Sequence, residues 1–240
     1  MTLVNVRYAP SGRYFRDERA ETLENQVLEP FTDPIEMGLR PGELVRRVAD
    51  REFYPVLFAR AFGSALIEEE TIAAALAQYV RAIVATRSRY DRERATVSHP
   101  LQPFPGFTAP ENRGKVLFLA SREDGGAGCA SCHEGEGFIM RKARGNGLPQ
   151  MGREDGGVGE ISGRSEQMGH FRSSSLRNIA VTAPYMHDGR FRTLEEVIDH
   201  YSGGIVAGAG LDPLLRVGQG NPVRIGLAST DRAAGVACLS

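Results

Sequence analysis

One short motif, Cys129-Ala-Ser-Cys132-His133, restricts what this chain can fold into more than any other feature. Its two thiols are one helical turn apart, so they can add to the two vinyl groups of a porphyrin, and the adjacent imidazole then falls under the iron. A thioredoxin-like thiol pair or half of a zinc site would have similar spacing. However, no βαβ pattern surrounds the motif and no second pair of cysteines follows it. We therefore expect one haem c bonded to Cys129 and Cys132, with His133 as the proximal ligand of the iron.

The composition is that of a globular chain of 240 residues with 41% hydrophobic residues and a formal net charge of -1. No run of five or six like charges is present, so nothing indicates nucleic acid as a partner. The longest apolar runs, such as residues 72–76, are much shorter than the roughly 18 residues that cross a bilayer, so we expect no membrane span. Cys238 lies in an apolar helical run and is expected to be an inert thiol.

Helical periodicity dominates and no convincing strand pattern appears, which predicts an all-α fold. We expect a c-type cytochrome domain with long loops, plus a partial second helical cytochrome-like domain. Helices are predicted at residues 21–28 (stopped by Pro30), 42–49, 52–62, 69–94, 110–121 and 193–201, and a long loop at 141–170. The prolines and Gly106 that follow His99 cannot continue a helix, so we place a domain boundary between residues 1–98 and 99–240.

The ligand on the distal side of the iron stays open when only the residue types are considered, because methionine, histidine and tyrosine can all bind haem iron. The candidates are Met140, Met151, Met168, Met186, His170, His187, His200 and Tyr201. Each of these side chains, taken alone, is more often a packing or surface residue than a ligand.

Three blocks around the motif resemble a known family. They are Lys115-Val-Leu-Phe, Phe171-Arg-Ser-Ser-Ser-Leu-Arg177-Asn, and Ala183-Pro-Tyr-Met-His187-Asp-Gly-Arg-Phe followed by Thr193-Leu-Glu-Glu. Through them the second half of the chain is similar to the bacterial di-haem cytochrome c peroxidases and the related MauG family. In that family the distal ligand of the C-terminal haem comes fourteen residues after the histidine of the last block, a position that is Tyr201 here. The resemblance also implies that Arg177 contacts the cofactor.

The first half resembles the distal side of the peroxidatic haem of the same family. The matching blocks are Tyr14-Phe-Arg-Asp-Glu-Arg-Ala, Leu23-Glu-Asn-Gln26 and Asp33-Pro-Ile-Glu36-Met-Gly. Gln26 and Glu36, ten residues apart, match a pair in which the glutamate moves the peroxide proton and the glutamine orients the peroxide. From composition alone, each would be an ordinary surface residue.

Two departures from the family pattern affect what we expect of this chain. The N-terminal CxxCH of the family is absent, so the sequence is expected to be a fragment or to start at an internal methionine, with a second haem in the full-length protein. The tryptophan that lies between the two haems falls on Arg16, and the chain contains no tryptophan. The carbonyl groups of Thr182 and Pro184 match two donors of the family's calcium site, whose asparagine would lie before Met1.

The resemblance implies reduction of hydrogen peroxide with electrons from a small cytochrome c or a copper protein, relayed through the haem at Cys129 and Cys132. Covalent haem attachment implies a periplasmic location, although no signal peptide is visible. A homodimer is a further option for the assembly. Two alternatives stay open: a mono-haem electron-transfer protein without peroxidase activity, and MauG-like oxidative modification of a partner protein.

Overall fold

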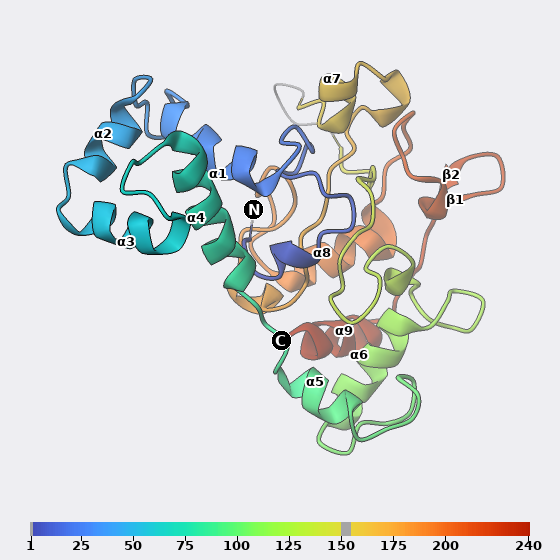
Figure 1. Ribbon diagram of the computed structural model, residues 1–240. Helices are drawn as coiled ribbons and strands as arrows, with labels where there is room; N and C mark the ends of the chain where they lie inside the picture. Colours follow the sequence, from blue (N-terminus) through green and yellow to red (C-terminus); the bar gives the residue numbers. More distant parts are fainter. Residues whose placement is uncertain (1, 150–154) are drawn as a thin grey trace.

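The computed structural model describes residues 2–149 and 155–240 and is predominantly helical, as the sequence predicts (Figure 1). Its α-helices are α1 (Leu23–Thr32), α2 (Glu43–Ala49), α3 (Phe53–Phe62), α4 (Glu69–Ala82), α5 (Arg89–Arg94), α6 (Ala109–Leu119), α7 (Val158–Ser162), α8 (Leu194–Asp199) and α9 (Ser229–Leu239). The short strands β1 (Arg216–Val217) and β2 (Asn221–Pro222) pair antiparallel in the part of the chain that is described. None of the described helices is long and apolar enough to cross a membrane.

Helices α1 to α4 form the part of the molecule drawn in blue to blue-green at the left of Figure 1, where α1 packs against α4. Leu23 of α1 and Ala77 and Val80 of α4 belong to one buried apolar cluster, which also takes in Tyr14 from the N-terminal segment. Burying an aliphatic side chain of this size stabilises the fold by about 1.5–3 kcal/mol. A second buried cluster consists of Phe58 of α3, Ile72 of α4 and Ile67, which precedes α4.

The C-terminal half is built on α6 and α9, which lie side by side, with α8 packed against α9 (Figure 1). The close approach of α6 to α9 depends on Gly114, because a Cβ atom at that position would lie 1.9 Å from the carbonyl oxygen of Ala234. Thr108 caps α6 and Thr193 caps α8, each through a hydroxyl that accepts a main-chain N–H. The cap at Thr193 agrees with the helix start predicted at residue 193.

The single helix predicted at residues 69–94 is wrong, because the chain forms α4 and α5 with an extended link between them. Ile83 leaves the helical conformation with ψ at 86°. The Asn5 side chain then holds both the N–H and the carbonyl of Ala85, at 2.9 and 3.0 Å. Ser88 and Asp91 form a capping box that starts α5. Distant tertiary hydrogen bonds thus interrupt a segment whose local pattern is helical throughout.

Two other helix predictions also need correction. Pro30 does not stop α1, which continues to Thr32 because the following turn supplies N–H donors to the last carbonyl groups, Met37 to Pro30 at 3.1 Å and Leu39 to Phe31 at 2.7 Å. The segment at 141–170 is not a loop throughout, since its described part contains α7 and a 3₁₀ turn at Ser165–Gln167.

The predicted boundary between residues 98 and 99 stays a prediction. Helix α5, which precedes it, makes its ion pairs with the C-terminal half: Arg89 with Glu111, Arg94 with Glu136 and Asp91 with Arg177. The N-terminal segment also reaches the C-terminal half, where the carbonyl of Arg16 accepts the N–H of Arg172 at 2.7 Å. These contacts bring residues from both halves to one site.

Candidate haem site

The Cys129-Ala-Ser-Cys132-His133 motif folds into a single tight turn. Residues Cys129–Ser131 form a 3₁₀ turn, and the carbonyl of Cys129 accepts the N–H groups of Cys132 and His133 at 3.1 and 3.0 Å. Gly128 enters this turn in the left-handed region, with φ at 74°. The turn thus presents both thiols and the imidazole to one cavity.

This cavity has a volume of about 300 Å³, and all three reactive residues of the motif line it, Cys129, Cys132 and His133. Its other walls come from several segments of the C-terminal half and from the N-terminal segment. They include Arg16, Phe118, Met140, Arg144, Asn146, Phe171, Met186, His187 and Tyr201. The wall is therefore largely apolar, with a few polar groups placed in it, as is usual for cofactor sites.

The donor set fits a covalently bound haem. The imidazole of His133 lies on this wall and has a hydrogen-bond partner in the main chain of Phe138, so its other ring nitrogen can bind a metal. Burial lowers the pKa of His133 to about 4, so the imidazole is neutral at pH 7, the form that binds iron. Burial also raises the pKa of the Cys129 thiol to about 12. The thiols thus stay protonated and unpaired until they are alkylated.

Tyr201 faces the same cavity from a π-helical turn, His200–Gly204, that continues α8. Such turns are rare and occur often at functional sites, because the extra residue re-aims the side chains around it. Burial raises the pKa of Tyr201 to about 12, and the amide side chain of Asn146 acts in the opposite direction. The phenol is therefore neutral by itself and would lose its proton only to a cation such as ferric iron.

The structure narrows the set of distal ligand candidates. His170 and His200 do not line the cavity. Each ring is held elsewhere by a main-chain carbonyl, with Nε2 of His170 2.8 Å from that of Gly210 and Nε2 of His200 3.0 Å from that of Asn146. Met168 is 40% exposed and also absent from the wall, and Met151 lies outside the described residues.

Four candidates remain on the wall, and three of them, Met186, His187 and Tyr201, have a side-chain partner, which for Tyr201 is Asn146. The sulfur of Met186 receives the amide of Asn146 at 3.4 Å. The ring of His187 stacks on Phe171 with centroids 3.9 Å apart. Met140 is the fourth candidate, and of the four only Tyr201 occupies the position that the resemblance implies.

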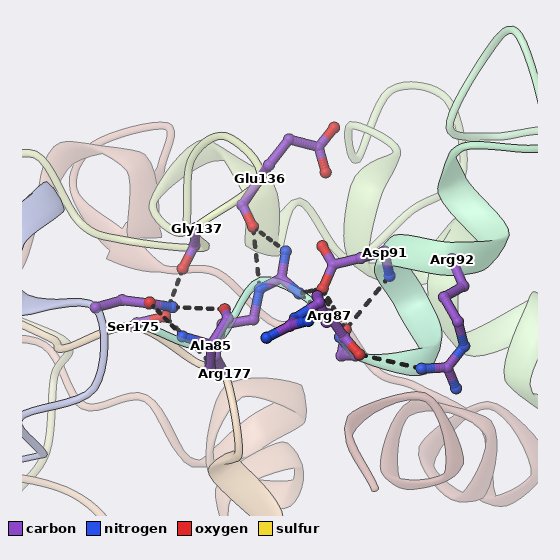
Figure 2. Close-up of polar contacts among 10 residues, drawn as sticks. Ala85, Arg87, Asp91, Arg92, Glu136, Gly137, Ser175 and Arg177 are labelled. Atoms are coloured by element: carbon purple, nitrogen blue, oxygen red, sulfur yellow. Dashed lines mark hydrogen bonds and ion pairs between the residues drawn. The ribbon is translucent and has the colours of Figure 1, made fainter. Parts of the chain in front are cut away.

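Arg177, expected to contact the cofactor, is not among the residues that line the cavity. Its buried guanidinium instead pairs with the Asp91 carboxylate and donates to the carbonyl of Glu136 and, at 2.8 Å, to Ser88 (Figure 2). Asp91 and Ser88 belong to the start of α5, whereas Glu136 lies three residues after the motif. Arg177 therefore ties α5 to the loop that follows His133, and its contact with the cofactor stays a prediction.

Three wall residues were not found from the sequence. Arg144 and Asp212 form an ion pair at 2.8 Å although they are 68 residues apart, and both are mostly buried. Asn146 touches both Met186 and Tyr201, as described above. No local pattern signals these residues, because their partners lie far along the chain.

Gln26 and Glu36, the predicted peroxide residues, do not line this cavity. Gln26 is buried in α1 with 7% exposure, and its Oε1 atom has no hydrogen-bond partner among the described residues. Glu36 is exposed in the turn that follows α1. Their roles stay predictions.

Thr182 and Pro184 do lie on the cavity wall. No group of three or more His, Cys, Asp or Glu side chains able to hold a metal ion occurs in the described residues. Carbonyl donors alone would not appear in such a group, so the calcium site also stays a prediction.

Comparison with known proteins gives relatives of one kind. Residues 1–96 match a family described as di-haem cytochrome c peroxidase. The methylamine utilization protein MauG of Methylophilus methylotrophus is 33% identical over 186 residues, 77% of this chain and 52% of that protein. The cytochrome c551 peroxidase of Nitrosomonas europaea is 28% identical over 188 residues, 77% of this chain and 53% of that protein. This chain thus spans about half the length of these relatives.

Solved structures agree with the sequence relatives. A MauG-like protein associated with microbial copper homeostasis is 33% identical with a TM-score of 0.75, over 95% of this chain and 71% of that one. The di-haem peroxidase BthA from Burkholderia thailandensis shares the fold at 21% identity, with a TM-score of 0.72, over 96% of this chain and 66% of its own.

Proposed function

Because this chain belongs to the family of MauG and the di-haem cytochrome c peroxidases, we propose that it relays electrons to hydrogen peroxide through a haem c held by Cys129, Cys132 and His133. The observation that carries the proposal is the convergence of two unpaired thiols, a neutral buried imidazole and the Tyr201 phenol on one cavity of about 300 Å³. The bound haem would supply a reversible one-electron couple.

The residues of the chain would bind and tune this group. Cys129 and Cys132 would hold the haem by thioether bonds, and His133 would bind the iron. Tyr201 would hold the distal side as a phenolate, which favours the ferric state, so the potential should lie below that of a His/Met haem. The amide of Asn146 would stabilise the phenolate, since it opposes the rise of the Tyr201 pKa.

Peroxide chemistry itself belongs, in this proposal, to a second haem of the full-length protein, next to α1. Gln26 would orient peroxide there, which agrees with its buried and unpartnered Oε1 atom. Glu36 would be the acid and base that moves the peroxide proton. Its exposed position implies that it becomes covered only when that second site is complete.

The partners and location follow from the same chemistry. The electron donor would be a small cytochrome c or a copper protein, and covalent haem attachment would require a periplasmic location. Calcium bound through the Thr182 and Pro184 carbonyls and a homodimeric assembly remain further parts of the proposal.

A second candidate function is oxidative modification of a partner protein. Tyr201 favours it, because a phenolate ligand stabilises high-valent iron, and several relatives are MauG proteins. A mono-haem carrier without peroxidase activity is the third reading. Turnover of peroxide, measured with and without a protein substrate, separates the three.

The test is a pyridine haemochrome assay combined with an intact protein mass, on protein made with the c-type maturation machinery. We expect one haem per chain, lost from the Cys129→Ala/Cys132→Ala double variant and kept by Cys238→Ala, its matched control. Absence of covalent haem from the wild type would refute the proposal. Haem without peroxide consumption would leave the mono-haem carrier.

Replacing Glu36 by Gln tests the peroxide chemistry in a full-length protein that turns over peroxide. We expect turnover to be lost while the haem at Cys129 stays bound and reducible. Turnover that persists would remove Glu36 from the mechanism.

A further inference from the structure

Arg16 lies in the N-terminal segment, yet it borders the cavity that faces Cys129 and His133. Its guanidinium donates to the carbonyl of Met186, which also lines the cavity. Its own carbonyl accepts the N–H of Arg172 at 2.7 Å, so the main chain is fixed on the C-terminal half. Arg16 is therefore a half-buried cation that is anchored at the cavity and does not project freely into solvent.

Among the residues that the structure describes, no carboxylate forms an ion pair with Arg16. Arg144 is neutralised by Asp212 at 2.8 Å. Asp188 acts to raise the pKa of Arg16, but its carboxylate already forms an ion pair with Arg190. The Nε and Nη2 atoms of Arg190 lie 2.7 and 2.6 Å from Oδ2 of Asp188.

A half-buried cation without a counter-charge is costly. Burial lowers the pKa of Arg16, which means that its surroundings disfavour the charged form more than Asp188 supports it. A guanidinium remains charged all the same, so an anion that binds in the cavity would relieve this cost. The planar fork of its N–H groups matches the two oxygens of a carboxylate.

We propose that Arg16 binds one propionate carboxylate of the haem in this cavity. The inference rests on the proposed haem function, because that haem brings two carboxylates to a wall that offers this cation. The guanidinium would neutralise one negative charge near the iron and so favour the reduced state relative to a site without it. Arg16 would therefore raise the midpoint potential of the haem.

The test uses the haem-loaded protein and the variants Arg16→Gln and Arg16→Lys. Arg122 offers the matched control, since it also lines the cavity but is exposed, and solvent screens its charge. We expect Arg16→Gln to lower the midpoint potential and to shift the propionate bending mode in the resonance Raman spectrum. Arg16→Lys should keep most of the potential because it keeps the charge, and Arg122→Gln should change neither quantity.

The outcomes distinguish this inference from the function on which it rests. Covalent haem with a potential and a propionate mode that are unchanged in Arg16→Gln would overturn the role of Arg16 and leave the haem site intact. A potential that falls equally in Arg16→Lys and Arg16→Gln would also overturn it, because a lost contact and not a lost charge would then be responsible. Failure of the wild type to bind haem would overturn both proposals.

Discussion

At the scale of single residues, burial beside the cavity decides which protonation state each group has. It keeps His133 neutral and ready to bind iron, and it keeps the Tyr201 phenol protonated, with pKa values of about 4 and about 12. A tyrosine with so high a pKa ligates only if the metal displaces its proton. If Tyr201 binds the iron, metal binding and proton release at Tyr201 would be one event, which makes its predicted role measurable.

Substitution Tyr201→Phe should remove the distal ligand and leave the Cys129 and Cys132 bonds in place. We expect the ferric absorption spectrum to change coordination and the midpoint potential to rise, because the phenolate no longer stabilises ferric iron. Tyr185→Phe is the control: Tyr185 lines the same cavity, but its hydroxyl donates to the carbonyl of Ile179 at 3.0 Å. A ferric spectrum of Tyr201→Phe identical to that of the wild type would show that Tyr201 is not on the iron.

At the scale of elements, α5 connects the two halves through charged side chains. The carboxylate of Glu111, at the start of α6, takes part in the capping box of that helix and also pairs with the guanidinium of Arg89 on α5. Arg177 joins the other side of α5 to the loop after the haem motif (Figure 2). The helix is only six residues long, so these tertiary contacts and not its propensity hold it in place.

The Glu111 contact should appear in the dependence of stability on pH. The hydrogen bond with Arg89 lowers the pKa of Glu111 from 4.5 to about 2. A carboxylate with a lowered pKa stabilises the fold above its ordinary pKa, and this contribution is lost as pH falls from about 4.5 to about 2. Thermal unfolding should therefore show Glu111→Gln less stable than the wild type at pH 7, with a difference that shrinks towards pH 2.

Glu196→Gln provides the comparison for that experiment. Glu196 closes the capping box of α8 but has no arginine ion pair among the described residues. Its substitution should give a smaller difference at pH 7. Equal differences at every pH for Glu111→Gln would contradict the role of the Arg89 contact.

Arg177 is expected to matter more for stability than any exposed ion pair. Its side chain is 6% exposed, and its removal leaves the Asp91 carboxylate without the partner that lowers its pKa. Removing one member of a buried pair costs about 3 kcal/mol, so Arg177→Met should lower the free energy of unfolding by that amount in urea titrations. Arg164→Met, which breaks a pair exposed by 61% and 60%, should cost less than about 1 kcal/mol.

At the scale of the whole molecule, the N-terminal segment joins parts that are far apart in sequence. It contributes Tyr14 to the α1–α4 cluster, Arg16 to the cavity and Asn5 to the link between α4 and α5. A haem site assembled from such distant pieces is stable only if the segment stays docked. The segment should therefore exchange its amide hydrogens slowly together with the C-terminal half.

Asn5→Ala tests this docking. Asn5 is 2% exposed and makes two hydrogen bonds to the main chain of Ala85, so the variant leaves a buried N–H and a carbonyl without partners, at a cost of about 2 kcal/mol. Hydrogen exchange should become faster at Ala85 and in the segment at 2–20. Ser11→Ala, in an exposed turn, should not change it. Unchanged protection in Asn5→Ala would mean that apolar contacts alone dock the segment.

The sequence by itself determined what local patterns encode. The helical periodicity of 42–62, the Thr193 cap and the all-α class agree with the structure, because each depends on residues within a few positions of one another. The motif at 129–133 likewise folds as one turn with its three reactive groups on one cavity.

Only the tertiary structure decided which distant groups meet. It broke the helical pattern at Ile83 through Asn5, paired Arg177 with Asp91, and paired Arg144 with Asp212 on the cavity wall. It also left Arg16 as a cation at the cavity without an ion pair in the described part of the chain. The physical reason is that the free energies of ion pairs and buried hydrogen bonds depend on distance and burial in space, which the order of residues along a chain does not specify.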